Sequence, residues 1–297
     1  MTEEPFWISR PRPGLSGTLT VPGDKSVSHR ALLFNAIADG DAAVTGLLEG
    51  EDCLATLAAL RAMGVVIEQQ GSGAYRVHGR GSHGLRAPAA PLDLGNSGTG
   101  MRLLAGLLAG QRFPSVLIGD ESLSRRPMAR IIRPLSAMGA AIRGRGNRPP
   151  LHIEPAERLS PIRYGMPVAS AQVKSALLLA ALYADGETEI VQPGPSRDHS
   201  ERLLAAMGAD IDVDGLTVRL RGPARLAAAD IAVPGDLSSA AFTLVAASVV
   251  AESDVTLPAV GINPTRRGVL DILGRMGAPI VRSLPSSICA PIRPRMS

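Results

Sequence analysis

A repeated pattern of apolar and polar positions runs along the chain. Each repeat opens with a small or polar turn, continues with an Ala/Leu-rich helix and a β-branched strand, and ends with a second helix that closes on Met-Gly. The Met-Gly pairs begin at Met63, Met138, Met207 and Met276, so they recur about every 70 residues. A recurrence of this length indicates one structural unit that is used several times.

The pattern predicts two helices in each repeat, an apolar one and a more polar one. The apolar helices are expected over residues 26–37, 101–108, 175–184 and 240–250, and the more polar ones over 51–63, 127–138, 199–207 and 267–276. Short strands are expected at residues 43–45, 65–67, 116–118, 189–191 and 255–257. Helices that are apolar nearly all round must be covered on every side. The sequence therefore predicts an α/β fold in which sheets wrap buried parallel helices, with each Met-Gly as a core residue followed by a helix C-cap.

The fourth repeat breaks off after Met276-Gly277. A strand is expected to begin at Ile280-Val281, but from Arg282 onward the sequence loses its periodicity and contains three prolines. This composition predicts an irregular tail over residues 282–297. A modular protein that stops in the middle of a unit is expected to have been cut short.

Composition restricts the class of protein. The 297 residues are 45% hydrophobic, enough for a large core and about two domains. No segment resembles a targeting peptide or spans a bilayer, and Cys53 and Cys289 lack disulfide or metal spacing, so a cytoplasmic protein with free thiols is expected. Aromatic residues make up 3%, which argues against a nucleic-acid groove, and the five histidines lack metal-site spacing.

The use of lysine points to an anion site. Of 31 basic residues only Lys25 and Lys174 are lysines, and each lies at a predicted helix start before a serine. Lys25, Ser26 and Arg30 place a compact charge, a hydroxyl and a guanidinium beside free helix N–H groups, an arrangement that favours phosphate or carboxylate. The same residues also suit a helix cap with solvated basic side chains. The placement of both lysines favours the anion site.

A second group of polar motifs lies at other helix starts. Gly95-Asn96-Ser97-Gly98-Thr99, with Arg102, combines close backbone approach with uncharged hydrogen-bonding groups and favours a ligand over a plain turn. Arg126 and Arg197 could clamp an anion, although each alone also suits a solvated charge. For Ser170-Ala171-Gln172 the residues alone favour a helix cap.

Taken together, five motifs in order resemble the EPSP synthase (3-phosphoshikimate 1-carboxyvinyltransferase) family. They occupy residues 23–30, 94–99, 126–128, 169–176 and 263–266, and the similarity extends from residue 15 to about residue 281. The resemblance implies the two-domain enolpyruvyl transferase fold, with three βαβαββ units in each domain and substrates between the domains. Four of the six units are present. On this plan residues 23–232 form a complete domain, and residues 1–22 and 233–297 belong to an incomplete second one. The apolar helix over residues 240–250 is then expected to lack the neighbours that would cover it and to expose an apolar face.

The resemblance also implies a reaction, which is the transfer of the enolpyruvyl group of phosphoenolpyruvate to the 5-hydroxyl of shikimate 3-phosphate. Phosphate leaves through a tetrahedral intermediate, no metal or organic cofactor takes part, and the protein is expected to act as a monomer without nucleic-acid or membrane partners. By this resemblance, the residues that hold shikimate 3-phosphate are Lys25, Ser26, Arg30, Ser170, Ala171 through its backbone, Gln172 stacked on the ring, and Arg197 near the phosphate. Those that hold phosphoenolpyruvate are Lys25, Asn96, Gly98, Thr99 and Arg126.

Two other functions remain open on the sequence. The family's acid/base carboxylates would lie in a segment that the 297 residues do not include, so a fragment that binds shikimate 3-phosphate without turnover, or binds nothing, is one alternative. UDP-N-acetylglucosamine enolpyruvyltransferase is the other. That sister enzyme would have Lys-Asn in place of Lys25-Ser26 and a cysteine within residues 119–126, where this chain has none.

Overall fold

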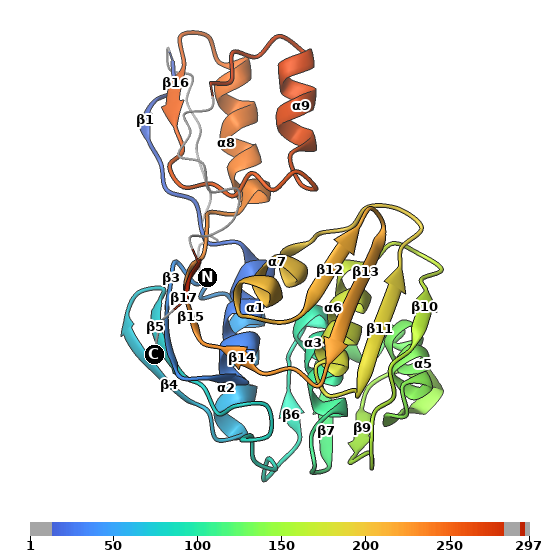
Figure 1. Cartoon of the computed structure of the whole chain (residues 1–297). Helices are drawn as coiled ribbons and strands as arrows, with labels where there is room; N and C mark the ends of the chain where they lie inside the picture. Colours follow the sequence, from blue (N-terminus) through green and yellow to red (C-terminus); the bar gives the residue numbers. More distant parts are fainter. Residues whose placement is uncertain (1–13, 282–291, 295–297) are drawn as a thin grey trace.

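The protein is described by a computed structural model over residues 14–281 and 292–294 (Figure 1). A larger lower part and a smaller upper part are joined, within residues 14–281, by two chain connections. The buried core follows this division. One large apolar cluster runs from Val27 to Val233, and a small separate cluster contains Val21, Leu237 and Leu270.

Three inner helices form the centre of the lower part. They are α1 (Lys25–Ala36), α3 (Gly98–Ala109) and α6 (Ala171–Ala181), and nearly every residue in them is buried. The closest approach lies between α3 and α6, where a Cβ on Gly106 would be 2.1 Å from the backbone oxygen of Ala176. Only glycine fits this crossing. The predicted burial of the apolar helices is confirmed for these three repeats.

Sheets and outer helices surround the inner helices, and the first three repeats share one order of four strands. In the second repeat the order is β6-β7-β9-β8, with β6 parallel to β7 and the other pairs antiparallel. The third repeat has the equivalent order β10-β11-β13-β12. The strands of these two sheets are β6 (Leu92–Asp93), β7 (Ser115–Ile118), β8 (Ala141–Gly144), β9 (Leu151–Glu154), β10 (Arg163–Gly165), β11 (Gly186–Val191), β12 (Ile211–Asp214) and β13 (Thr217–Gly222).

The sheet of the first repeat takes its first strand from a distant part of the chain. Its order is β17-β15-β3-β5-β4, and β15 (Ala229–Ala232) runs parallel to β3 (Asp41–Thr45). The other strands are β4 (Val66–Gly71), β5 (Ala74–His78) and β17 (Ile292–Pro294), which is antiparallel to β15. The outer helices of the three repeats are α2 (Glu51–Ala62), α5 (Ala129–Ala137) and α7 (His199–Ala206). With β15 included, all three repeats are βαβαββ units, as the resemblance implied.

Short elements complete the lower part. They are β2 (Ala38–Asp39), α4 (Glu121–Ser124), a 3-10 turn η1 (Arg145–Asn147) and β14 (Leu226–Ala227), which pairs with β2. The tail expected to be irregular over residues 282–297 lies mostly outside the described residues. The part that is described, β17, is a strand.

The Met-Gly pairs end the outer helices as predicted. Gly64, Gly139, Gly208 and Gly277 have φ of +85°, +94°, +91° and +88°, the left-handed conformation of a helix C-cap. The methionines of the first three pairs are buried, with exposures of 0–1%. Met276 is 76% exposed, so the expected core position is wrong for the fourth pair.

The upper part contains the fourth repeat. β1 (Ser16–Thr18) pairs in parallel with β16 (Asp254–Thr256), and α8 (Leu237–Val249) packs beside α9 (Gly268–Arg275). The cover on every side that its apolar composition predicts is not found, whereas the exposure expected for an incomplete second domain is confirmed. Phe242 is 82% exposed and Val249 77% exposed, because in the described residues α8 packs against α9 and β16 and part of its surface is left uncovered. No strand forms at Ile280-Val281.

The two connections between the parts are paired with one another. The amide of Asp24 donates to the carbonyl of Pro234 over 2.8 Å. The amide of Asp236 donates to the carbonyl of Pro22, also over 2.8 Å. Asp24 then caps α1 and Asp236 caps α8. The Val-Pro-Gly-Asp motif, which occurs at Val21–Asp24 and again at Val233–Asp236, thus forms a symmetric crossing that places two helix starts side by side.

Candidate functional site

The start of α1 carries the first group of candidate residues. Asp24 accepts the amide of Val27 at 2.9 Å and fixes the helix N-terminus. The side chain of Lys25 is 52% exposed, and its Nζ lies 2.9 Å from Oδ2 of Asp52 on α2. The hydroxyl of Ser26 accepts from Nη1 of Arg197 at 2.7 Å, which brings together two residues that lie 171 positions apart. Lysine, serine and arginine therefore meet at one helix start.

Arg30 lies beneath this helix start and is 2% exposed. Its guanidinium donates to the Ser26 carbonyl, to Ser175 of α6 and to Ser200 of α7, over 2.9, 2.6 and 2.7 Å. Burial lowers the pKa of Arg30 to about 10. Arg30 thus joins α1, α6 and α7, and it supports Ser26 from below.

The start of α3 carries the second group. Ser97 caps the helix by accepting the amide of Gly100 at 3.0 Å. Beside it, the amide nitrogen of Asn96 donates to Asp120 over 2.7 Å, and the Asn96 oxygen accepts from Arg126. The helix opening, the exposed Asn96 and the half-buried Arg126 therefore share one edge of the lower part.

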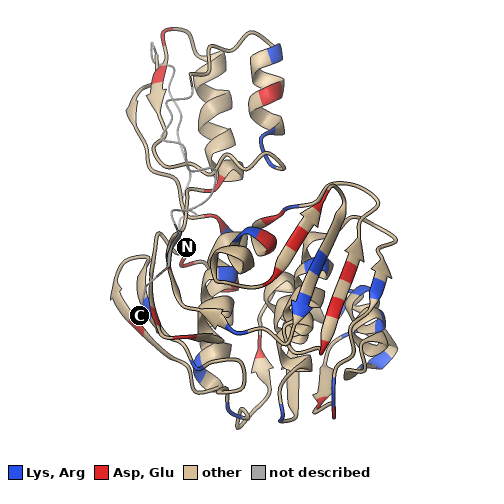
Figure 2. Cartoon of the chain, viewed as in Figure 1, with Lys and Arg blue, Asp and Glu red and all other residues tan. Residues whose placement is uncertain are grey.

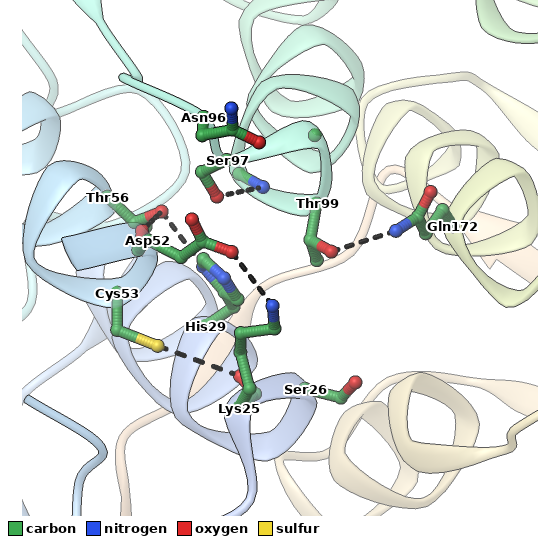
Figure 3. A network of polar contacts seen from close by, with 12 residues as sticks. Lys25, Ser26, His29, Asp52, Cys53, Thr56, Asn96, Ser97, Thr99 and Gln172 are labelled. Atoms are coloured by element: carbon green, nitrogen blue, oxygen red, sulfur yellow. Dashed lines mark hydrogen bonds and ion pairs between the residues drawn. The ribbon is translucent and has the colours of Figure 1, made fainter. Parts of the chain in front are cut away.

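Gln172 links α6 to α3. Its Nε2 donates to the hydroxyl of Thr99 over 2.8 Å, and its Oε1 accepts from Nη1 of Arg102 at 2.8 Å. Arg102 also donates to the Gly98 carbonyl over 3.0 Å. Figure 3 shows Thr99 and Gln172 reaching toward one another across the region that Lys25 also faces.

Like charges are concentrated around these helix starts. Burial lowers the pKa of Arg102, and the neighbouring Arg126 and Arg130 lower it further. Burial likewise lowers the pKa of Arg197, and the positive charge of Arg266 in the upper part is the second cause that lowers it. A bound anion would relieve both repulsions.

The structure assigns different places to the other candidates. Ser170 caps α6 by accepting the amide of Val173 at 3.4 Å, and the carbonyl of Ala171 accepts from Ser175 at 2.6 Å. Neither contacts another candidate side chain among the described residues. Lys174, the second lysine, is 1% exposed and pairs with Glu201 at 2.5 Å, so it is part of the core.

Sequence reasoning gave no role to four residues that the structure brings to this site: Asp52, Arg130, Ser175 and Ser200. Asp52 and Ser200 belong to outer helices, where a charge or hydroxyl is normally solvated. Arg102 was noted in its motif without a role. The signal that could have identified Ser175 is its place directly after Lys174, in the helix that begins with Gln172.

No group of three or more His, Cys, Asp or Glu that could hold a metal ion occurs within residues 14–281 and 292–294. Cys53 is a buried free thiol, and burial raises its pKa to about 12. Cys289 lies outside the described residues.

Comparison with known proteins identifies the family. The sequence matches the family described as EPSP synthase (3-phosphoshikimate 1-carboxyvinyltransferase) over residues 10–290. This chain belongs to the EPSP synthase family. A 3-phosphoshikimate 1-carboxyvinyltransferase of Acidithiobacillus ferrooxidans is 57% identical over 274 residues, which are 92% of this chain and 63% of the relative. One from Xanthomonas oryzae is 56% identical, covering 92% and 62%.

Solved EPSP synthases have the same fold. The enzyme from Acinetobacter baumannii superposes with a TM-score of 0.88 at 52% identity, over 94% of this chain and 64% of that one. A second structure from the same organism gives 0.85 at 54% identity. The two-domain enolpyruvyl transferase fold is therefore shown. The chain spans about three fifths of the length of the EPSP synthases that it matches.

The described part of the chain contains no helix with the length and apolar character needed to cross a bilayer.

Proposed function

We propose that this chain takes part in enolpyruvyl transfer from phosphoenolpyruvate to the 5-hydroxyl of shikimate 3-phosphate. The observation that carries the proposal is the convergence of three helix starts, α1, α3 and α6, with the cations Lys25, Arg126 and Arg197. Both substrates are anions with phosphate groups. Helix N-termini and guanidinium groups are the protein groups best suited to such ligands.

The shikimate 3-phosphate side of the proposed site is formed by α1, α6 and α7. Lys25, Ser26 and Arg197 supply donors for the phosphate and hydroxyl groups, while Arg30 holds Ser26 and the two helices together. Ser170, the Ala171 backbone and Gln172 would contact the ring from the start of α6. Arg30 is 2% exposed and donates to Ser26, Ser175 and Ser200, so it supports the site from within the protein.

The phosphoenolpyruvate side is formed by the start of α3. Asn96, Thr99 and Arg126 offer donors for a carboxylate and a phosphate, and Gly98 keeps the helix opening accessible. In the transfer, the 5-hydroxyl oxygen loses its proton and bonds to C2 of the donor while C3 takes up a proton, which opens the C2=C3 double bond. The bond from C2 to the phosphate oxygen then breaks, C3 gives up a proton, and the double bond forms again. Fixed cations stabilise the charge that develops on the departing phosphate.

The family also supports an arrangement of the chain. We place one domain at residues 23–232 and assign residues 1–22 and 233–297 to a second domain. The two separate apolar clusters support this division, although Val233 packs in the large cluster and β17 pairs with β15 of the lower part. We further propose that the protein acts as a cytoplasmic monomer, without a metal, an organic cofactor, nucleic acid or a membrane as partner.

Binding of shikimate 3-phosphate without turnover is the second candidate. The exposed apolar residues Phe242 and Val249 on α8 favour it, because they leave the upper part without the cover that α1, α3 and α6 have. The sister UDP-N-acetylglucosamine enolpyruvyltransferase is not supported, since the matching family and relatives are EPSP synthases.

Calorimetry with shikimate 3-phosphate tests the proposal. The 297-residue chain is expected to bind shikimate 3-phosphate. Lys25→Ala is expected to weaken binding by at least about tenfold, because the loss of one hydrogen bond to a charged group has an effect of this size. Arg163→Ala, which removes an exposed cation on β10, serves as the control and leaves the affinity unchanged. Absence of binding to the starting chain would overturn the proposal.

An assay of phosphate release then separates the two candidates. The purified chain is given both substrates, and release that depends on shikimate 3-phosphate supports transfer. Binding without release supports the second candidate.

A further inference from the structure

Within the described residues, the ammonium of Lys25 has one hydrogen-bond partner, the carboxylate of Asp52. Nζ and Oδ2 lie 2.9 Å apart, and the two side chains are 52% and 25% exposed. Asp52 lies in the first turn of α2, 27 positions along the chain. The contact therefore depends on how α1 and α2 pack, which Figure 3 shows from close by.

A second contact between the same helices fixes that packing. Lys25 and His29 are four residues apart on α1, and Asp52 and Thr56 are four residues apart on α2, so each pair lies on one helix face. His29 Nδ1 and Thr56 Oγ1 are 2.9 Å apart, and both residues are fully buried. Burial lowers the pKa of His29 to about 3, so this inner contact is a neutral hydrogen bond. The inner contact sets the register in which the outer one forms.

The groups around Lys25 leave Asp52 as its ion-pair partner. On α1, Asp24 uses its carboxylate to cap the helix and His29 is neutral. On α2, burial raises the pKa of Cys53 to about 12, so its thiol carries no charge. From α3 and α6 the facing residues in Figure 3 are the uncharged Thr99 and Gln172.

We infer that Asp52 is a positioning residue for Lys25, an inference that rests on the proposed function of the site. A lysine side chain has a flexible four-carbon stem, and ordering it during binding costs affinity. The contact with Asp52 orders the stem in advance and uses one of the three N–H donors of the ammonium. Two donors remain for an anionic ligand at the start of α1.

Because the chain has only two lysines, the accessibility of the Lys25 amine can be measured directly. Reductive methylation of the folded 297-residue chain modifies accessible amines, and peptide mapping separates Lys25 from the α-amino group and from Lys174. Asp52→Asn is expected to raise the labelling rate of Lys25 about two- to fivefold. This is the fold-change that corresponds to the stabilisation usually found for an exposed ion pair. Lys174 is 1% exposed, so its protection in the same sample reports that the variant is folded.

Glu51→Gln is the matched control. Glu51 precedes Asp52 in the same first turn and forms no ion pair in the described part of the chain, so its removal tests a general charge effect. The control should leave the labelling rate unchanged. Equal rates for Asp52→Asn and Glu51→Gln would overturn the inference. If Lys174 becomes labelled in Asp52→Asn, Asp52→Glu and Asp52→Gln are compared instead, and only the carboxylate should slow labelling.

Ligand binding forms an independent arm. In calorimetry with shikimate 3-phosphate, Asp52→Asn is expected to bind about two- to fivefold more weakly, and Asp52→Glu to recover part of the loss. Unchanged affinity in Asp52→Asn would overturn the positioning role. If the starting chain binds no shikimate 3-phosphate while the labelling contrast is present, the proposed function fails and the Asp52–Lys25 contact stands.

Discussion

Gly98 is the member of the candidate site that has no side chain, and its surroundings show the reason. A Cβ at this position would lie 2.9 Å from Nη1 of Arg102 and 3.0 Å from Nη1 of Arg126. Both atoms are the ends of flexible side chains, so an added methyl would move the guanidinium groups and leave the helix intact. The absence of a side chain therefore protects the geometry of two arginines.

Gly98→Ala is expected to lower the affinity for phosphoenolpyruvate, measured in the presence of shikimate 3-phosphate, on the order of tenfold because it displaces a charged donor. The urea midpoint of unfolding should not fall. Gly268→Ala is the matched control, because Gly268 also begins a helix and has open space where a Cβ would lie. Loss of stability in Gly98→Ala with unchanged affinity would contradict this explanation.

Single residues were predictable from the sequence where their role depends on near neighbours. Lys25, Asn96 and Gln172 stand at helix starts, which short motifs mark clearly, and the structure places them there. The burial of Arg30 and Lys174 was not predictable, because it depends on serines and a carboxylate that other helices supply. Sequence indicated that these residues are charged, but not whether the charge faces a ligand or the core.

At the scale of elements, the contact between α1 and α2 makes stability depend on pH. His29 has a folded-state pKa of about 3 and an ordinary value of 6.5, so the unfolded chain binds a proton that the folded chain does not. The contribution of neutral His29 to the free energy of unfolding is therefore fully present above pH 6.5 and is lost as the pH falls toward 3. His199, with a pKa of about 4, acts in the same direction.

Between pH 6 and pH 5, where unfolded histidine is mostly protonated, the free energy of unfolding is expected to fall with decreasing pH. Each of the two histidines contributes up to about 1.4 kcal/mol per pH unit. His29→Gln should make this dependence shallower by about that amount in urea titrations. An identical slope in the variant would show that His29 takes up a proton in the folded chain.

The contact between α6 and α7 includes a buried ion pair. Lys174 and Glu201 are 1% and 3% exposed at the side chain, and burial is the main cause that raises the pKa of Glu201. Removing one partner strands the other charge in the core.

Lys174→Met is expected to lower the free energy of unfolding by about 3–5 kcal/mol, the usual loss when a buried pair is broken. The double variant with Glu201→Leu should recover much of this loss, since no charge is then left unpaired. Thermal and urea unfolding of the two variants give the comparison. A double variant no more stable than Lys174→Met would exclude the stranded charge as the cause.

Elements were predicted well where the pattern is local and poorly where partners are distant. The helices α1, α2 and α7 agree with the sequence to within a few residues, and the Met-Gly pairs end the outer helices. The place of β15 in the sheet of the first repeat was not predictable, because its partner β3 lies almost 190 residues earlier. The exposure of α8 was predicted from the resemblance, which implied an incomplete second domain; the apolar composition of the helix alone predicted burial.

At the scale of the whole molecule, the two parts differ in how they cover their apolar helices. α8 carries no charged residue, as Figure 2 shows, and its outer face presents Phe242, Val245 and Val249 at exposures of 82%, 43% and 77%. Ile272 on α9 and Met276, which follows that helix, are also exposed, at 57% and 76%. An apolar surface of this kind favours association.

The 297-residue chain is expected to bind a hydrophobic dye and, above the concentrations at which it acts as the proposed monomer, to self-associate. Replacing Phe242 and Val249 by serine should reduce the dye fluorescence severalfold and shift sedimentation toward the monomer. Val213→Ser, at a 52% exposed apolar residue on β12, is the control and should change neither. Equal dye binding by the Phe242/Val249 variant and by Val213→Ser would show that the dye binds to another surface.

The paired connections at Val21–Asp24 and Val233–Asp236 have a consequence for how such a molecule could arise. The stretch between them enters and leaves the lower part at one point, where its two ends are joined by hydrogen bonds of 2.8 Å. Closing the stretch therefore costs little chain entropy beyond that of the fold itself. A polypeptide with this property is a cassette. Stretches whose two ends lie close together are the ones that tolerate insertion into another protein.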